Sequence, residues 1–312
     1  MRDFDDKQSV STADHHRRRR LVALGSACVV ALGTLVIVAV SVGSPGKWNP
    51  QQLEQGAIAE KPKMELALQA KAAALVIAKR KAQTKLENAA IDQAIQQSGI
   101  VSQAGMENKE VALTFDDGPS EYTGAILDTL KKYDADATFF TLGNQVGLYP
   151  LPMQRAVAEG HVVGNHTWDH QDLTRLGPKD IRTEMSQQAG AVTGKALPAP
   201  KLFRPPYGAY NAAVVAEARK QGMLTVLWSI DTNDYTRPAP AAMAQQVIDT
   251  VQPGAIILMH DGGGDRTTTS AALPMILKGL EKKGYKMVTV PQLLLDNPPA
   301  VEQQDVNRTP VA

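Results

Sequence analysis

The sequence contains one cysteine among 312 residues, Cys28, and it stands within an apolar stretch. A chain with a single cysteine has no internal disulfide framework and offers no cluster of thiolates to a metal ion. Any metal site in this protein must therefore be built from His, Asp and Glu side chains.

The sequence also lacks an excess of charge of either sign. It has 33 Lys and Arg residues against 32 Asp and Glu residues, a formal net charge of +1. Much of the visible positive charge lies in segment 17–20, which is four arginines, so no basic face marks the rest of the chain for nucleic acid. We therefore exclude nucleic-acid binding. Hydrophobic residues make up 43% of the chain, which is enough for at least one domain with a full core.

Charged residues are absent from segment 21–43, whose 23 residues are long enough to cross a hydrocarbon core of ~30 Å as one helix. The four arginines precede this segment and only Lys47 follows it closely, so the positive-inside rule predicts that residues 1–20 form a cytoplasmic tail. The sequence thus predicts a single-pass protein of the cell membrane whose main domain lies outside the cytoplasm. The alternative is a cleaved signal peptide, which would make the protein secreted.

Glycine and proline are absent from segment 64–97, which is rich in Ala, Gln, Lys and Glu, and Gly99 follows where a helix end favours glycine. This composition predicts a helical stalk within segment 44–108. Leu68, Leu75 and Ala82 hint at a heptad spacing that breaks after two repeats. A solvated spacer is therefore the preferred interpretation, with weak self-association through the stalk as the alternative.

From residue 109 to residue 296, short β-rich runs alternate with amphipathic segments such as 123–132 and 243–251. The β-rich runs are 111–115, 137–142, 161–164, 201–203, 224–230, 255–259 and 285–290. This alternation predicts an α/β domain with a parallel sheet, either a barrel or a doubly wound sheet. No glycine-rich phosphate loop follows the first run, which weakens the nucleotide-binding, doubly wound alternative. We expect residues 297–312 to form a disordered tail.

Polar residues gather directly after the predicted strands. They are Asp116, Asp117, His166, His170, Arg204, Asp231 and His260. In a β/α barrel the carboxyl ends of all strands open onto one face, so these residues can converge there although they are far apart in the sequence. The pattern predicts a site at the mouth of the barrel.

His166 and His170 are four residues apart, a spacing that can bring two imidazoles to one face of a helical turn. With one carboxylate they make a zinc-type set of three ligands, although two such histidines can also be solvated by chance. A metal ion lowers the pKa of a coordinated water from 15.7 to about 7, so hydrolysis is the natural reaction class.

The adjacent carboxylates Asp116 and Asp117 point in different directions from a strand end, so one can bind metal while the other faces a substrate. Their sequence, Asp-Asp-Gly-Pro, is equally good turn chemistry. Arg204 precedes two prolines that would hold its guanidinium near a carboxylate, and the alternative is an arginine in a surface turn. His260 could act as a general acid if a carboxylate such as Asp231 kept it protonated, and the alternative is a core histidine.

Five short motifs, in order along the chain, resemble those of carbohydrate esterase family 4, the polysaccharide deacetylases of the nodulation-deacetylase type. They are Thr114-Phe115-Asp116-Asp117-Gly118, His166-Thr167-Trp168-Asp169-His170, Arg204-Pro205-Pro206-Tyr207-Gly208, Asp231-Thr232-Asn233-Asp234 and Leu258-Met259-His260. The resemblance implies a distorted (β/α)7 barrel over residues 109–296. It also implies a divalent metal ion, usually Zn²⁺, and N-acetylated sugar polymers as substrates.

By this resemblance Asp117, His166 and His170 would hold the metal ion. Asp116 would be the base that takes a proton from the attacking water, and Arg204 would position Asp116. The chain would therefore be a polysaccharide N-deacetylase, a hydrolase acting on linear amides.

The resemblance also assigns the rest of the pocket. The backbone N–H of Tyr207 would face the oxyanion, and His260 would protonate the leaving amine while Asp231 orients it. Leu258 would line the pocket for the acetyl methyl group. Trp228 is a further candidate for the substrate-binding wall, although such a tryptophan is more often a core residue.

Two positions depart from the family pattern: Tyr235 stands where a tryptophan is common, and Gln171 where a proline is common. Neither removes a ligand or a proton carrier, so we expect an active enzyme. The first candidate polymer is peptidoglycan, because an anchored domain can reach it, followed by chitin oligomers or exopolysaccharide. An O-acetyl glycan esterase and a catalytically silent wall-binding module are the alternatives.

Overall fold

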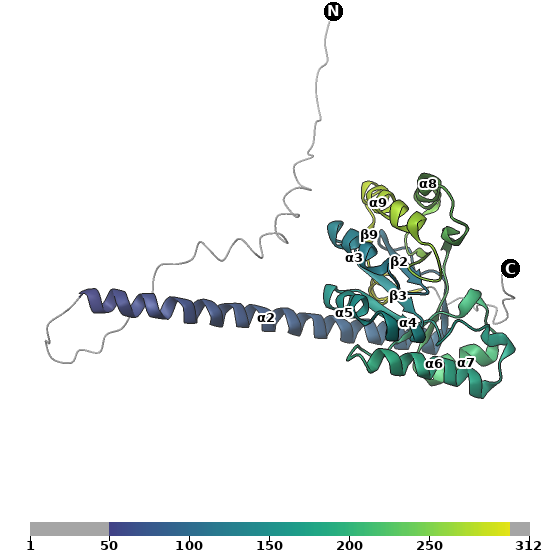
Figure 1. The fold of residues 1–312 in the computed structure, drawn as a ribbon, viewed down its shortest axis with the longest axis horizontal. Coiled ribbons are helices and arrows are strands. Elements are labelled where there is room, and N and C mark those ends of the chain that lie inside the picture. The colour runs from purple at the N-terminus through teal and green to yellow at the C-terminus, as the bar shows by residue number, and fades with distance from the viewer. Residues whose placement is uncertain (1–49, 300–312) are drawn as a thin grey trace, which may run out of the picture. The chain divides into compact units, whose positions relative to one another are not determined.

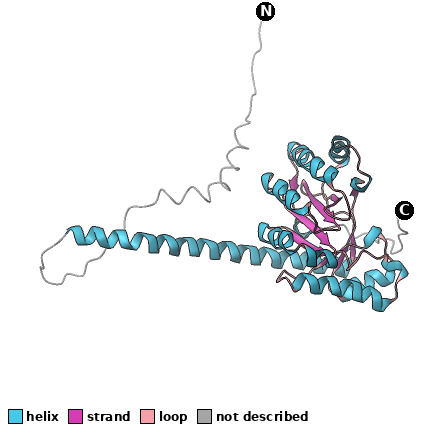
Figure 2. Cartoon of the chain, in the orientation of Figure 1, coloured by secondary structure: helices cyan, strands magenta, loops and turns pink. Residues whose placement is uncertain are grey.

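The computed structural model describes residues 50–299 (Figures 1 and 2). The predicted cytoplasmic tail 1–20, the predicted transmembrane helix 21–43 and residues 300–312 lie outside the described range. The chain divides into two units, residues 1–68 and residues 69–312. In the first unit the described residues are helical and belong to helix α2 (Pro50–Gln97). Among the helices of residues 50–299, none combines the length and the apolar character that a membrane span requires.

The second unit is built on a sheet whose strand ladders are all parallel. The strands are β1 (Ile100–Val101), β2 (Glu110–Asp116), β3 (Ala137–Thr141), β4 (Val162–Asn165), β5 (Leu202–Phe203), β6 (Leu224–Val226), β7 (Ile230–Asp231), β8 (Ile256–His260) and β9 (Lys286–Met287). Their order is β1-β6-β5-β4-β3-β2-β8-β7, with β9 beside β2. Because no ladder joins β1 to β7 in the described chain, the sheet is an open half-barrel. The predicted α/β class with parallel strands is confirmed.

Helices alternate with these strands, as Figure 2 shows in cyan and magenta. They are α3 (Thr123–Lys132), α4 (Gly143–Leu148), α5 (Pro150–Glu159), α6 (Pro178–Thr193), α7 (Ala212–Lys220), α8 (Pro240–Thr250), α9 (Thr267–Lys282) and α10 (Val290–Asp296), with short 3₁₀ turns η1 (Leu173–Arg175), η2 (Pro206–Gly208) and η3 (Asp234–Thr236). Helix α8 packs against α9, and α6 against α7. The predicted helix 123–132 has the bounds of α3, whereas the predicted helix 243–251 begins earlier, at Pro240, because proline suits the first turn of a helix.

Strand β2 directs its alternate side chains to two environments. Val111, Leu113 and Phe115 are fully buried in the core cluster that also holds the apolar faces of α3, α8 and α9. Thr114 and Asp116 alternate with them and face the other way, where the Thr114 hydroxyl and the Asp116 carboxylate accept hydrogen bonds from one guanidinium. Each fully buried aliphatic or aromatic side chain contributes roughly 1.5–3 kcal/mol. The period-2 pattern thus anchors the strand on one face and presents polar groups on the other.

The predicted β-run 224–230 contains two strands rather than one. β6 pairs with β1 and β5, whereas β7 pairs with β8 at the opposite end of the strand order. Between them the N–H of Leu227 bonds the carbonyl of Val101, and that of Ser229 bonds the carbonyl of Ile256. A continuous apolar run cannot reveal such a crossing, because both strands are buried and their periodicity is the same.

The C-terminal end of helix α2 packs on the sheet rather than standing in solvent. Ile91 and Ala94 are 2% and 3% exposed and belong to a core cluster with β5, β6 and β8. Arg80 Nη2 donates to the carbonyl of Val157 at 2.8 Å, and Lys201 forms an ion pair with Asp92 at 2.7 Å. The prediction of a solvated spacer is therefore wrong for this end of the stalk.

Two further segments contribute to the α/β unit. Strand β1 lies within the predicted stalk and linker, 44–108, and extends the sheet beside β6. Asn297, at the start of the predicted tail, is fully buried, and its side-chain amide donates to Glu110 Oε2 at 3.1 Å. Leu68 and Leu75 of α2 are exposed, and self-association through the stalk stays a prediction.

Candidate active site

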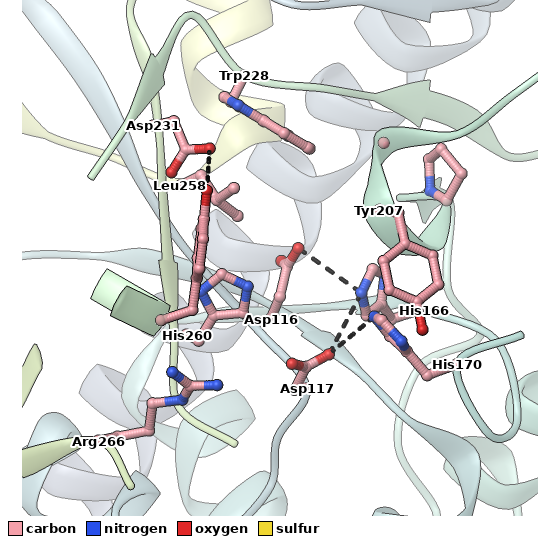
Figure 3. A pocket seen from close by; sticks show the side chains of 13 residues that line it. Asp116, Asp117, His166, His170, Tyr207, Trp228, Asp231, Leu258, His260 and Arg266 are labelled. Atoms are coloured by element: carbon pink, nitrogen blue, oxygen red, sulfur yellow. Dashed lines mark hydrogen bonds and ion pairs between the residues drawn. The ribbon is translucent and has the colours of Figure 1, made fainter. Parts of the chain in front are cut away.

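The carboxyl ends of the strands open into a cavity of about 320 Å³, shown in Figure 3. It is lined by Asp116, Asp117, His166, His170, Pro205, Tyr207, Gly208, Trp228, Asp231, Tyr235, Leu258, His260 and Arg266. Every side chain predicted for the site lines this cavity except that of Arg204. Parallel strands place their carboxyl ends at one edge, so residues that are distant in sequence converge there.

Asp117 and two histidines face one another at one side of the cavity (Figure 3). Asp117 Oδ1 lies 3.5 Å from His166 Nε2 and 3.3 Å from His170 Nε2, and this buried oxygen has no hydrogen-bond partner among the described residues. A tetrahedral ion held at ~2.0–2.1 Å from each ligand separates its ligands by about 3.3 Å. The three residues therefore fit a divalent metal ion.

The environment of His166 leaves Nε2 free to act as a ligand. Its Nδ1 lies 2.6 Å from the carbonyl oxygen of Arg204, which can only accept a hydrogen bond. In the neutral imidazole the proton must then sit on Nδ1, so Nε2 presents its lone pair to Asp117 and His170. A partner of this kind is typical of metal-binding histidines.

The two histidines are not on a helix, contrary to the expectation from their spacing. The segment after β4 is a loop in which Thr167 and His170 have φ values of 71° and 70°. The N–H of Thr167 bonds Asn165 Oδ1 at 2.9 Å, and the N–H of His170 bonds Thr167 Oγ1 at 3.1 Å. Two left-handed residues thus fold the loop back and bring the rings to 5.1 Å between centroids.

Charge and burial act against each other in this cluster. Burial raises the pKa of Asp117, but the close approach of His166, with smaller effects of His260 and His170, holds it well below its ordinary value. Burial lowers the pKa of His166, but the carboxylates of Asp116 and Asp117 leave it raised. Burial and the charge of His166 lower the pKa of His170. The carboxylate of Asp117 is therefore ionised over the physiological range.

The buried side chain of Arg204 fixes one carboxylate oxygen of Asp116. The arginine is fully buried, and its Nη1 donates to Asp116 Oδ1 and to Thr114 Oγ1, both at 2.8 Å. Its Nε and Nη2 donate to the carbonyls of Val226 and Leu227, at the point where the chain crosses between β6 and β7. Asp116 Oδ2 makes no hydrogen bond with a described residue and lies 3.7 Å from His166 Nε2. One oxygen of Asp116 is thus fixed and the other is available in the cavity.

His260 is bonded to Asp234, not to Asp231 as the sequence predicts. Its Nδ1 lies 2.7 Å from Asp234 Oδ1, and its backbone N–H donates to Asp234 Oδ2 at 2.8 Å. Thr269 Oγ1 donates to the same oxygen, and Asp234 is 1% exposed. Asp231 instead accepts from the N–H of Asn233 at 2.8 Å and lies 3.5 Å from the hydroxyl of Tyr235.

The contact with Asp234 sets the protonation of His260. Burial lowers the pKa of His260, but the hydrogen bond and the charge of Asp234 leave it above its ordinary value. Because Nδ1 carries the proton shared with Asp234, an imidazolium at this position has Nε2–H to offer. Nε2 forms no hydrogen bond within the described chain, so the group can act as a general acid.

Tyr207 and Trp228 form a further part of the cavity wall. Tyr207 lies in η2 with φ 60°, its ring packs edge-on against that of His170 at 4.5 Å, and its backbone N–H bonds no described residue. A Cβ at Gly208 would lie 2.7 Å from the Trp228 ring, so glycine is required for this close approach. Leu258 is 3% exposed and completes the lining.

Left-handed backbone conformations gather around this cavity. Asp117, Thr167, His170, Tyr207 and Asn233 all have φ between 52° and 71°. Non-glycine residues in this region cost of order 1 kcal/mol or more each, and such residues concentrate at functional sites, where the surrounding fold holds them in place. The strained positions here belong to the motifs that carry the polar side chains.

Comparison with known proteins agrees with this geometry. The family model described as "Polysaccharide deacetylase" matches residues 103–226. A peptidoglycan-N-acetylglucosamine deacetylase of Bacillus cereus is 40% identical over 189 residues, which are 60% of this chain and 88% of that protein. The chain belongs to carbohydrate esterase family 4, the polysaccharide deacetylases.

Two further relatives bear on the substrate and the fold. A chitooligosaccharide deacetylase of a Bradyrhizobium species is 37% identical over 198 residues, 59% of this chain and 90% of that protein. The crystal structure of the Bc1960 peptidoglycan N-acetylglucosamine deacetylase superposes with a TM-score of 0.62 and 33% identity. The match covers 69% of this deacetylase and 97% of that chain. The fold resemblance therefore extends over nearly the whole of the solved structure.

A loop of the deacetylase that sequence reasoning missed follows His260. The N–H groups of Asp261 and Gly262 donate to the carbonyl of Asp116, at 3.0 Å and 3.3 Å. Gly263 has φ 72°, and a Cβ there would lie 2.3 Å from Asp117 Oδ2. The loop therefore contacts the backbone of Asp116 and the side chain of Asp117. The run of glycines after His260 was the sequence feature that could have revealed this close packing.

Asp261 is a buried acid behind this loop. Its Oδ2 accepts from Thr123 Oγ1 at 2.6 Å, and the side chain is fully buried. Burial, with the charges of Asp117 and Asp116, raises the pKa of Asp261 to about 7. The residue thus joins helix α3 to the strand end that carries the site.

Tyr235 and Gln171, the two residues that depart from the family pattern, lie at the edge of the site. The ring of Tyr235 packs edge-on against that of His260 at 5.7 Å, and its hydroxyl donates to Asn233 Oδ1 at 2.7 Å. Gln171 Nε2 lies 3.2 Å from Asp169 Oδ2 and 3.4 Å from Glu184 Oε1. Neither residue displaces a member of the polar cluster.

Proposed function

We propose that this deacetylase removes N-acetyl groups from polysaccharides that contain N-acetylglucosamine, by hydrolysis that depends on a divalent metal ion. The observation that supports this most is the composition of one cavity. A three-ligand cluster, the free oxygen of Asp116 and the Asp234-bonded His260 all line it. We further propose that the half-barrel is the distorted (β/α)7 barrel that the family resemblance implies.

Asp117, His166 and His170 would hold the ion, which we assign as Zn²⁺ because imidazole and carboxylate ligands suit it. When bound, the ion polarises the acetyl carbonyl and lowers the pKa of water. The lone pair at His166 Nε2 and the unpartnered Asp117 Oδ1 support this assignment.

Asp116 acts as the general base in this proposal. Its Oδ1 is held by Arg204, so Oδ2 is the oxygen that takes the proton of the attacking water. The water oxygen joins the acetyl carbon while the C–N bond breaks, and the products are acetate and a free amine. His260 supplies the proton to the leaving nitrogen from Nε2, and Asp234 keeps its ring oriented.

Tyr207 and the apolar wall account for substrate binding. The unbonded backbone N–H of Tyr207 faces the developing oxyanion, a type of donor whose removal typically costs about 3–4 kcal/mol. Leu258 and Trp228 line the same cavity and would enclose the acetyl methyl group. Exclusion of water by these side chains strengthens the electrostatic contacts.

The first candidate polymer is peptidoglycan, and chitin oligomers and exopolysaccharide come next. The relatives are named for peptidoglycan and for chitooligosaccharide, so the names support both. The uncharged segment 21–43 behind four arginines would anchor the protein in the cell membrane with the catalytic domain outside, or release it if cleaved. A domain on the outer surface is within reach of wall polymer.

The proposal is tested with the full-length protein on peptidoglycan and on N-acetylglucosamine oligomers, with acetate and free amine measured together. We expect acetate and amine in equal amounts, loss of both with a chelator, and loss in Asp116→Asn. Acetate without amine from O-acetylated glycans would favour the esterase alternative. A folded protein that retains zinc and releases no acetate would favour the silent module.

A further inference from the structure

One buried cation in the catalytic cavity forms no ion pair with any described residue. Arg266, the residue before helix α9, is 5% exposed and lines the cavity beside His260 and Asp117 (Figure 3). It is the only Lys or Arg among the residues that line the cavity. The proposed mechanism gives it no role.

The contacts of Arg266 satisfy only part of its guanidinium. Nε donates to the carbonyl of Gly262, and Nη2 donates to that of Gly263 at 3.0 Å. Nη1 forms no hydrogen bond, and no carboxylate oxygen within residues 50–299 lies within 4.0 Å of the group. Figure 3 shows the end of the Arg266 side chain near His260 and Asp117 in the cavity, so the N–H groups of Nη1 are available to a ligand.

Arg204 is a buried arginine of the same domain whose guanidinium is paired entirely within the protein. It is fully buried, pairs with Asp116 at 2.8 Å and donates to three further oxygens. A buried charge without such a partner is unfavourable. The contrast indicates that the partner of Arg266 is supplied by a molecule that enters the cavity.

We infer that Arg266 binds a carboxylate of the glycan substrate, carried on the sugar next to the acetamido group that is removed. This inference rests on the proposed deacetylase function and names the substrate class within it. The planar guanidinium suits a carboxylate, and a charge-assisted hydrogen bond from Nη1 fixes its position. Peptidoglycan strands without stem peptides carry a free lactyl carboxylate on alternate sugars, whereas in strands with peptides this group is an amide, and chitin oligomers carry none.

The other charges of the cavity act on a substrate carboxylate in both directions. Asp116, Asp117 and Asp231 repel it, whereas an imidazolium at His260 and the proposed metal ion attract it. Arg266 differs from these groups because it takes no part in the proposed chemistry. A neutral oligomer leaves its guanidinium unpaired, so the arrangement favours an anionic glycan.

The test compares two substrates of one shape. One is a tetrasaccharide of alternating N-acetylglucosamine and its lactyl ether, without peptide; the other is the same saccharide with each lactyl carboxylate converted to an amide. The full-length wild type, Arg266→Gln, Arg266→Lys and Arg237→Gln are assayed for kcat/KM on both. Arg237 is a matched control because it pairs with Asp265 at 3.9 Å and does not line the cavity.

We expect the wild type to prefer the carboxylate form by about tenfold, the size of one charge-assisted hydrogen bond. The ratio should fall to about one in Arg266→Gln, stay above one in Arg266→Lys and stay at the wild-type value in Arg237→Gln. A wild type that treats both forms alike overturns the inference, and this result needs no variant. An unchanged ratio in Arg266→Gln also overturns it.

Binding separates this inference from the proposed function. The deacetylated forms of both saccharides are titrated into the wild type by calorimetry. If no acetate is released from any substrate, the proposed function fails, and tighter binding of the carboxylate form still supports the anion subsite. Equal binding of the two forms counts against the subsite even where deacetylation is normal.

Discussion

Two buried histidines flank strand β4 (Val162–Asn165), and their surroundings differ in kind. His161, before the strand, is 4% exposed, and His166, after it, is 2% exposed. His161 Nδ1 accepts from the N–H of Ala137 at 3.2 Å, and its Nε2 has no partner in the described chain. His166 Nε2 instead faces two carboxylates.

The pKa values follow the partners and not the burial. Burial lowers the pKa of His161 to about 4, so this ring is neutral. Burial acts on His166 too, but Asp116 and Asp117 raise its pKa above the ordinary value. Equal burial therefore gives a packing residue at one end of the strand and a candidate metal ligand at the other. The comparison predicts that the same substitution impairs activity at His166 but only stability at His161.

The largest expected effect is that of His166→Gln. The variant loses a proposed metal ligand, and a metal ion supplies several kcal/mol of transition-state stabilisation. We expect kcat/KM for acetate release to fall by at least about 10³-fold. Zinc affinity, measured by competition with a chelating dye, should fall in parallel. Full zinc binding with full activity would remove His166 from the metal site.

Asp116→Asn should separate chemistry from metal binding. The amide keeps the shape of the side chain but cannot take a proton, and general-base catalysis contributes about 10²–10⁴-fold. We expect a loss of that size in kcat with zinc affinity within a few-fold of the wild type. A variant that loses zinc and activity together would make Asp116 a ligand rather than the base.

Asp234→Asn should move the pH dependence. Asp234 raises the pKa of His260, so His260 stays protonated to higher pH in the wild type. Without the negative charge that pKa falls, and the alkaline limb of the kcat/KM profile moves to lower pH. At neutral pH we expect about a tenfold loss. An alkaline limb that does not move would show that His260 is not the proton donor.

Gly263→Ala should lower the affinity for zinc, although Gly263 is not itself a proposed ligand. The added Cβ would lie 2.3 Å from Asp117 Oδ2, so the carboxylate must shift. Changes around metal ligands typically reduce affinity 10- to 100-fold. Gly264→Ala is the matched control, because Gly264 also has a positive φ but its Cβ would meet nothing within 4 Å. Equal losses in both variants would point to backbone strain instead.

The smallest effect on activity is expected for His161→Gln, the counterpart of the first substitution. Acetate release and zinc affinity should stay at the wild-type level, while the free energy of unfolding falls by about 1–2 kcal/mol. Since the folded pKa of His161 is about 4, the unfolded chain binds the extra proton first as pH falls. The wild type should therefore lose stability from about pH 6.5 down to pH 4 through this residue, and the variant should not. Loss of activity would contradict the comparison.

The sequence predicted the parts of the fold that depend on local pattern. Helix α3 has its expected bounds, and the buried run at β2 lies where alternation and turn residues placed it. The motif residues line one cavity because parallel strands carry them to the same edge. These features require only periodicity and strand direction, both of which the sequence contains.

The rest depends on contacts between distant segments. The choice between Asp231 and Asp234 is made by the left-handed Asn233, which turns η3 so that Asp234 meets His260. The packing of Ile91 against the sheet, and the role of Arg266, are equally invisible in local pattern. A sequence shows which residues can act, and tertiary contacts decide which of two similar ones does.

The most direct test of a metal-dependent deacetylase is the activity of one preparation as its metal content changes. The full-length protein is stripped with a chelator, zinc is added back in steps, and bound metal and acetate release from an N-acetylglucosamine oligomer are measured at each step. We expect release to rise in proportion to bound zinc and to level off at one ion per chain. Acetate release by the folded, metal-free protein at the reloaded rate would contradict the account.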